Sequence, residues 1–144
     1  MDLLALEPLL IERLLAQGLE GVTVRPLRAV TEIAHRPVPT PALLVSYAGG
    51  EVLESRTDAQ AVRIAERWLI TAVVRNVANA SDSSAAQDAG PLAGAALEAL
   101  MGWQPPGTSR PLTLSALPAP GFGGGYLWVP IELSTEFVRR VPRH

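Results

Sequence analysis

A long alternation of apolar and polar residues, "AVRIAERWLITAVVRN" at 61–76, constrains the fold more than any other feature. One face of this segment carries Val62, Ile64, Trp68, Ile70, Ala72 and Val74. The other face carries Arg63, Arg67, Thr71 and Arg75, together with Leu69 and Val73. A period of two over more than a dozen residues predicts a long β-strand with apolar side chains on both faces. Such a strand needs cover on both sides.

One helix is predicted before this strand in the chain, and a second helix is predicted after it. Leucines recur at a spacing of three to four within residues 3–17, which predicts an amphipathic helix. The segment "PLAGAALEALMGW" predicts a second helix that starts with Pro91 in its first turn and ends at Gly102. Asp88 would then lie where the helix dipole favours an acid.

Four further strands are expected at 22–27, 42–47, 112–117 and 126–138. Gly49-Gly50 should end the strand at 42–47, which would place Glu51 and Glu54 at a turn. Pro130 lacks an N–H for a ladder, so the last strand should be an edge strand or carry a bulge there.

The order of elements, α-β-β-β-α-β-β, predicts an α+β fold. We expect one domain over 1–144 with a mostly antiparallel or mixed sheet of about five strands and two helices on one face. Residues 139–144 should form a frayed tail.

The glycine-rich segment "GFGGGY" at 121–126 could hold a phosphate or could only turn the chain. Gly121 and Gly123 fit the first two positions of a dinucleotide fingerprint, but the third falls on Tyr126. A strand follows instead of a helix, so no helix N-terminus faces a phosphate. We therefore expect a hairpin or flexible loop that binds no nucleotide.

Residues for catalysis or metal binding are scarce. The chain has no cysteine and two histidines, His35 in a proline-rich loop and His144 at the end. Neither fits a catalytic triad or a zinc site with suitable spacing. Glu51 and Glu54 could form an acid/base pair, but a solvated hairpin tip accounts for them equally simply. We expect no enzymatic activity, no cofactor and no metal.

Composition favours a chain that buries surface against partners. Charged residues make up 18%, below the usual ~25%, while hydrophobic residues reach 48%. The net charge of −2 gives no overall basic field for nucleic acid. No apolar run is long enough to cross a membrane, and the acidic start "MDLL" differs from a signal peptide, so we expect a soluble protein inside the cell.

The charged residues of the long strand are the main candidates for an interface. Arg63, Arg67 and Arg75 could form a solvated outer face, a surface facing phosphate, or an intersubunit face that pairs with acids. The candidate acids, on connections long enough to reach neighbours, are Glu51, Glu54, Asp58, Asp82 and Asp88. Trp103 could pack in the core or act as a half-exposed interface anchor.

Four stretches together resemble a known family. They are "PTPALLVSYAGG", "RWLITAVVRN", "AGPLAGAALEALMGWQPP" and "APGFGGGYLWVPIELST". In this order and spacing they resemble the tail terminator proteins of long-tailed phages, especially the Mu-like family of small tail proteins. The resemblance covers about residues 4–138.

This resemblance implies a structural virion protein rather than an enzyme. Such subunits form a hexameric ring that caps the tail tube, ends its polymerisation and offers a surface to the head-completion or connector protein. Double-stranded DNA passes through the ring without sequence specificity. The resemblance places the protein at the tail-head junction of the virion, after assembly in the host cytoplasm, and implies no membrane contact, catalytic motif or ligand set.

Two other kinds of protein remain open on the residues alone. One is another neck or tail-completion subunit, or a tube-like subunit that stacks without limit. The other is a small ligand-binding α+β domain, which would need a deep pocket with converging polar groups.

Overall fold

A computed structural model describes residues 2–27, 39–76 and 84–142, with only the backbone described at 84–87. The elements are α1 (Leu6–Leu15), β1 (Thr23–Pro26), β2 (Ala42–Ser55), β3 (Ala61–Arg75), α3 (Ser84–Leu100), β4 (Thr113–Ala116), β5 (Gly121–Gly123) and β6 (Tyr126–Arg140). The expected α+β class is confirmed, because the described residues form a six-stranded sheet and two helices in one domain.

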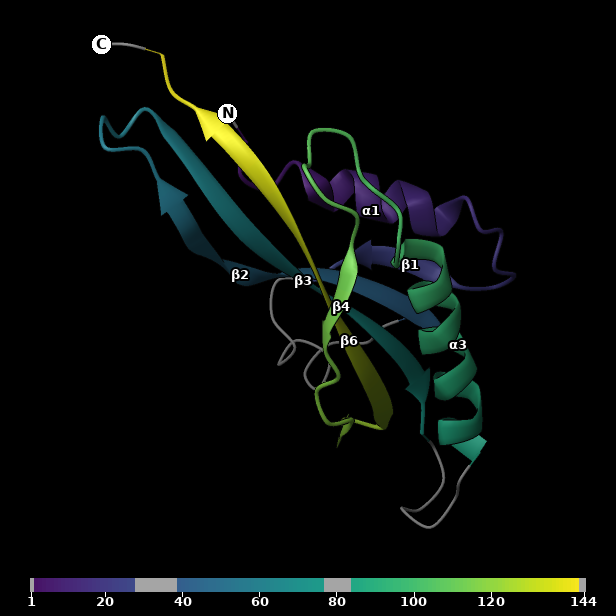
Figure 1. The fold of residues 1–144 in the computed structure, drawn as a ribbon. Helices are drawn as coiled ribbons and strands as arrows, with labels where there is room; N and C mark the ends of the chain where they lie inside the picture. The colour runs from purple at the N-terminus through teal and green to yellow at the C-terminus, as the bar shows by residue number, and fades with distance from the viewer. Residues whose placement is uncertain (1, 28–38, 77–83, 143–144) are drawn as a thin grey trace.

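The sheet is mixed, with the order β1-β2-β3-β6-β4 and with β5 also paired to β6. Strand β1 runs parallel to β2, and every other pair is antiparallel. The long strand predicted from the alternating pattern is β3, which pairs with β6 over its whole length (Figure 1). It is the centre of the sheet.

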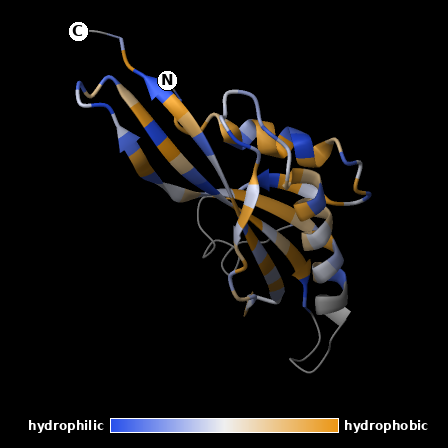
Figure 2. Cartoon of the chain, viewed as in Figure 1, coloured by the Kyte–Doolittle hydropathy of each residue, from blue (hydrophilic) through white to orange (hydrophobic). Residues whose placement is uncertain are grey.

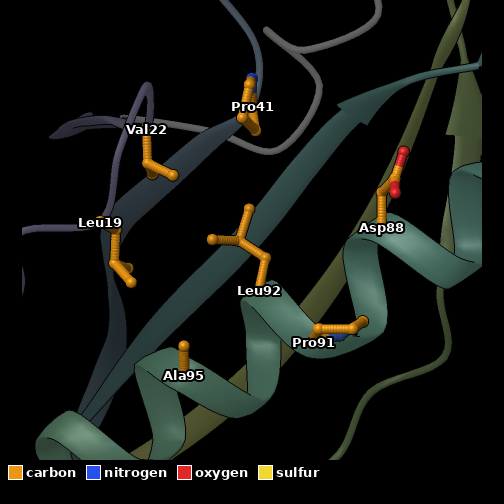
Figure 3. A pocket seen from close by; sticks show the side chains of 7 residues that line it. All are labelled: Leu19, Val22, Pro41, Asp88, Pro91, Leu92 and Ala95. Atoms are coloured by element: carbon orange, nitrogen blue, oxygen red, sulfur yellow. The ribbon is translucent and has the colours of Figure 1, made fainter.

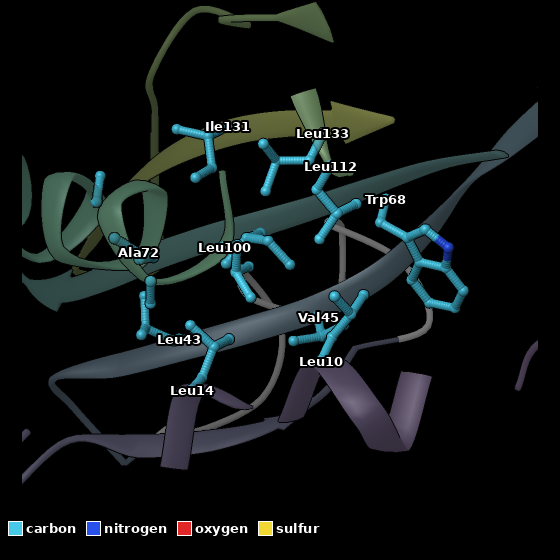
Figure 4. Close-up of a cluster of buried hydrophobic side chains, with 14 of the residues drawn as sticks. Leu10, Leu14, Leu43, Val45, Trp68, Ala72, Leu100, Leu112, Ile131 and Leu133 are labelled. Atoms are coloured by element: carbon cyan, nitrogen blue, oxygen red, sulfur yellow. The ribbon is translucent and has the colours of Figure 1, made fainter. Parts of the chain in front are cut away.

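Both helices pack on one face of the sheet, as the sequence predicts (Figure 1). Leu6, Leu10 and Leu14 recur every four residues, so they form one buried stripe of α1. They meet Trp68 and Ile70 of β3 in the main core, which also takes side chains from α3 and β6 (Figure 4). The core is built almost entirely from aliphatic side chains and one indole.

The opposite face of the sheet is partly buried within the chain. A second cluster there contains Leu27, Ala42, Leu44, Val73 and Tyr126. Val73 is fully buried although it shares its face with the arginines of β3. The cover that β3 was predicted to need on both faces is therefore supplied at this apolar end by the subunit itself.

The prediction that Pro130 lies in an edge strand or at a bulge is wrong, because β6 is an inner strand and its register with β3 is unbroken. In the tight β5–β6 hairpin, Tyr126 faces Gly123, so Tyr126 directs its N–H toward β5. Every second residue points the same way, which includes position 130. Along β6, pairing with β5 stops at Trp128 and pairing with β4 starts at Glu132. The missing N–H of Pro130 thus faces a gap in the ladder.

The second helix starts earlier than its proline suggests. Helix α3 begins at Ser84, and Pro91 lies inside it rather than in its first turn. Asp88 is therefore an exposed residue on the second turn of the helix and not a capping acid. Pro91 removes one helical hydrogen bond, but the flanking Ala89, Leu92 and Ala93 are buried, and this packing holds the helix together through the proline.

Two strands run further than their sequences suggest. Strand β2 continues through Gly49-Gly50 to Ser55, so Glu51 and Glu54 lie within a strand and not at a turn. Strand β6 reaches Arg140, and the N–H of Val141 donates to the Gln60 carbonyl at 2.8 Å. The tail expected to fray at 139 is instead held in the sheet by pairing with β3.

The glycine-rich segment forms a hairpin. Gly124 and Gly125 are the two turn residues between β5 and β6, and both have positive φ, 57° and 83°. A two-residue hairpin turn of this kind matches the twist of its strands and requires φ above zero at both positions. A Cβ on Gly121 would overlap the Trp128 indole on the paired strand. The glycines thus serve a turn and a close packing contact.

Candidate assembly surfaces

Three strands extend beyond the two helices and form what we call the arm, residues 48–55 of β2, 61–67 of β3 and 134–140 of β6 (Figure 1). Figure 2 shows hydrophilic and hydrophobic residues alternating along it, whereas the strands under the helices are mostly hydrophobic. Several apolar side chains of the arm are exposed, including Val52 at 64% and Val138 at 45%. Exposed apolar side chains grouped on one projection are typical of a contact surface.

One face of the arm carries a chain of ion pairs. Arg63 contacts Glu136 at 2.9 Å and Glu54 at 3.5 Å, and Arg110 contacts the other oxygen of Glu136 at 3.1 Å. The hydrogen bond from Arg110, followed by that from Arg63, lowers the pKa of Glu136 below its ordinary value. Arg63 thus already has carboxylate partners within its own subunit.

The other two candidate arginines differ from Arg63. Arg67 lies 4.0 Å from Glu132, a weak contact on a half-exposed side chain. Arg75 is exposed at the end of β3 and forms no ion pair with any described residue. The three arginines share one face of β3, as the alternation predicts, but only Arg75 is left without a described acidic partner.

The candidate acids do not form one group. Glu54 is paired with Arg63, and Asp58 contacts Arg56 at 3.2 Å in the turn at the tip of the arm. Glu51 is exposed on β2. Asp88 lies on α3, on the helical side of the sheet (Figure 1). Asp82 lies outside the described residues.

Trp103 is half-buried next to the core. It packs against the main hydrophobic cluster, and the Arg13 guanidinium lies 4.9 Å from its ring centroid. The Nε of Arg13 also donates to the Ala99 carbonyl at 3.0 Å, which holds the guanidinium over the ring. Core packing therefore accounts for much of the Trp103 side chain, and a role at an interface stays a prediction.

Glu66 is a buried carboxylate that sequence reasoning missed. Its side chain lies on the apolar face of β3 and accepts a hydrogen bond from Trp68 Nε1 at 2.6 Å. Burial raises the pKa of Glu66 above its ordinary value. The sequence does contain a signal for this burial. Glu66 lies two residues from both Ile64 and Trp68, and alternation places all three side chains on one face.

A pocket of about 420 Å³ lies between α3 and the segment that leads into β1 (Figure 3). Its lining residues are Leu19, Val22, Pro41, Asp88, Pro91, Leu92 and Ala95. In Figure 3, Leu92 points from α3 toward Val22 and Leu19, and Asp88 lies toward one end. Asp88 is the only charged residue among those described in the lining, and it pairs with no described residue.

A second apolar groove of about 400 Å³ runs between α3 and β6. Its lining includes Gly94, Leu97, Leu117 and Val129, and no charged residue among those described. Neither this groove nor the Asp88 pocket brings several polar groups together as an enzyme site would.

No group of three His, Asp or Glu side chains within 2–27, 39–76 and 84–142 could hold a metal ion. His35 and His144 lie outside the described residues. Among the helices described, none is long and apolar enough to cross a bilayer.

Comparison with known proteins identifies the family. No curated protein matches the chain. A family model described as phage tail terminator protein matches residues 1–143, which is nearly the whole sequence. Proteins of this family are structural components of the phage virion and not enzymes. This match agrees with the resemblance carried by the four sequence stretches, and the chain belongs to the phage tail terminator protein family.

Proposed function

We propose that this chain forms a hexameric ring that caps the phage tail tube, ends its polymerisation and offers a surface for head attachment. The observation that carries the proposal is the family match over residues 1–143. Double-stranded DNA passes through the ring without sequence specificity. The chain acts without catalysis, cofactor or metal.

The arm supports a subunit role. Its exposed apolar side chains gain little free energy in an isolated subunit, because they stay in contact with water. Docking on a neighbour would bury them. A contact between two different surfaces of one chain repeats head to tail, and it closes into a ring when the rotation per subunit permits.

The arginine face of β3 contributes to this assembly. Arg75 is its strongest candidate, since it is exposed and forms no ion pair with a described residue. Arg63 and Arg67 contribute less, because each already lies near a carboxylate of its own chain. Glu51, Asp58 and Trp103 are exposed or half-exposed and remain candidates for contacts with the neighbour, the tube or the head.

The partners follow from this role. One face of the ring meets the tail tube protein, and the other meets the head-completion or connector protein. The mature protein lies at the tail-head junction of the virion after assembly in the host cytoplasm. It makes no contact with a membrane.

Tube growth in the presence of the chain tests the function directly. Tail tube protein from the same phage is polymerised with and without the purified chain, and tubes are measured by electron microscopy. We expect short tubes that end in a ring and bind heads. Tubes of unchanged length without an end structure would refute the proposal.

The arginine face is tested with matched variants. Arg75→Glu should reduce ring occupancy on tubes, whereas Arg25→Glu, an exposed arginine on β1, should not. Equal occupancy for both variants would mean that Arg75 is merely solvated.

The same preparation separates the alternatives. A tube-like subunit would stack into filaments without the tube protein, whereas another neck subunit would join heads without shortening the tubes. A ligand-binding domain would respond in a thermal-shift screen against nucleotides and metals.

A further inference from the structure

Charge divides the described residues between the two layers of the fold. The helices and their flanks, residues 2–20 and 84–100, carry six carboxylates and a single arginine, Arg13. The carboxylates are Asp2, Glu7, Glu12, Glu20, Asp88 and Glu98. The sheet and its connections carry eight arginines against six carboxylates. The arginines are Arg25, Arg56, Arg63, Arg67, Arg75, Arg110, Arg139 and Arg140. One side of the subunit is therefore acidic and the other bears excess arginine.

The tip of the arm combines a free cation with apolar side chains. Arg140 is exposed and forms no ion pair with a described residue, and Val138 lies two residues away on the same face of β6. Val141 is 39% exposed and is held at the tip by its hydrogen bond to Gln60. The end of β6 thus presents a guanidinium beside Val138 on one face, whereas Val141 follows the strand at the next position.

The Asp88 pocket has the complementary composition. It offers at one end the Asp88 carboxylate, which pairs with no described residue, and the side chains of Leu19, Val22 and Leu92 beside it (Figure 3). A volume of about 420 Å³ accommodates a few side chains rather than a whole element. The pocket therefore suits an apolar strand end that carries one cation.

The two surfaces lie far apart on one subunit. The arm projects away from the helices, while α3 lies on the other side of the sheet's centre (Figure 1). Residues 61–67 alone extend about 23 Å at the rise of a β-strand. A contact between arm and pocket must therefore join two subunits, and it joins different surfaces, as a head-to-tail ring requires.

Strand pairing is a less suitable mode for the arm. No described strand pairs with the outer edge of β2 beyond β1, but the register of β2 with β3 shifts between Tyr47 and Gly50 and again between Val52 and Glu54. Bulges of this kind twist an open edge and discourage addition of another strand. Side-chain docking of the tip avoids this obstacle.

The geometry points to a specific contact within the proposed ring: Arg140 of one subunit pairs with Asp88 of the next, and Val138 enters the pocket beside it. This inference rests on the proposed function, because it assigns the contact between ring subunits. Among the candidate acids it selects Asp88, which lies on α3, as the main partner of the arm.

Chemical cross-linking gives the sharpest test, because the native chain has no cysteine. An Arg–Asp pair keeps its Cα atoms further apart than a disulfide can span. The double variant Asp88→Cys with Arg140→Cys is therefore assembled on tail tubes and treated with a bismaleimide cross-linker. We expect covalent oligomers up to the hexamer on a denaturing gel. Each single-cysteine variant should give no more than a dimer. A double variant that caps tubes but stays monomeric after cross-linking would overturn the contact.

Charge exchange provides a second measurement. Asp88→Arg and Arg140→Asp alone should each lower ring occupancy at least tenfold, and the two together should restore most of it. Glu98→Arg is the matched control on α3, since Glu98 is exposed outside the pocket lining. Circular dichroism verifies that each variant is folded.

The outcomes distinguish the contact from the function. If the parent chain neither forms rings nor caps tubes, the proposed function fails. If the parent caps tubes and both single charge variants do so equally well, only the Arg140–Asp88 contact is wrong.

Discussion

The same three strands build two regions with different physical characters. In the body of the sheet, where β2, β3 and β6 lie under the helices, Leu43 and Val45 have no exposed surface. In the arm the same strands continue to pair, with two register shifts between β2 and β3, yet Val52 is 64% exposed. No residue of the arm belongs to the three hydrophobic clusters of the described residues, although Phe137 within it is buried. Strand pairing and ion pairs therefore contribute more to the arm than a hydrophobic core does. The body stabilises the subunit, and the arm is left available for a partner.

The largest expected difference between the regions is in the loss of stability when an isoleucine on the same face of β3 is replaced by alanine. Ile70 and Ile64 lie on the same face of β3, but Ile70 is 1% exposed in the body and Ile64 is half-buried in the arm. Ile70→Ala should lower the free energy of unfolding by about 2–5 kcal/mol, since it leaves a cavity. Ile64→Ala should cost about 1 kcal/mol or less. Equal losses in urea unfolding would mean that the arm has a core.

The next largest change in stability is expected at the end of the body opposite the arm. Gly121→Ala places a methyl group against the Trp128 indole, so the hairpin must shift and stability should fall by about 1–3 kcal/mol. Gly90→Ala is the control, because nothing lies within 4 Å of its added Cβ and alanine favours helix. It should raise stability by about 0.5–1 kcal/mol. Thermal unfolding measures both, and a neutral Gly121→Ala would show that the indole moves freely.

Replacing each of two buried threonines by valine should change the free energy of unfolding in opposite directions. Thr71 Oγ1 in the body has no hydrogen-bond partner among the described residues, so Thr71→Val should raise stability by about 1 kcal/mol. Thr135 Oγ1 at the root of the arm donates to the Arg110 carbonyl at 2.6 Å, so Thr135→Val should lower it by about 1 kcal/mol. Urea titration measures the two changes. A loss for Thr71→Val would reveal a bound partner for that hydroxyl.

The tip of the arm holds a small amount of backbone strain. Ala59 has a φ of 57°, in the left-handed region that disfavours residues with a Cβ. Ala59→Gly should therefore raise the melting temperature, with a gain below about 1 kcal/mol. Thr57→Gly, at a neighbouring tip position without positive φ, should lower it. Equal effects from the two changes would argue against strain at Ala59.

The smallest effect is a contrast in pH dependence between two carboxylates. Burial raises the pKa of Glu66 in the folded state, so its favourable contribution exists below the ordinary value of 4.5 and is lost as pH rises. Arg110 and Arg63 lower the pKa of Glu136, so its contribution exists above 4.5 and is lost as pH falls.

Glutamine variants test these signs by urea unfolding at about pH 7 and about pH 4. Glu66→Gln should be more stable than the parent at neutral pH and should converge with it in acid. Glu136→Gln should be less stable at neutral pH and should also converge. Shifts in the same direction for both variants would contradict the assigned causes.

The sequence by itself determined the class of fold and the family. Alternation over 61–76 identified β3, the leucine spacing identified α1, and the absence of a helix after Gly125 excluded a phosphate loop. These features are local, because side-chain periodicity records which face of an element meets the core. The family match over 1–143 agrees with them.

Only the tertiary structure decided which segments become neighbours. It placed Pro130 in an inner strand opposite a gap, and it continued β2 through Gly49-Gly50 because β3 provides a partner there. It also joined Arg63 to Glu136, separated by 73 residues, and buried Glu66 beside Trp68. Strand pairing and ion pairing depend on contacts between distant segments, and no local pattern in a single sequence encodes which distant segment will be chosen.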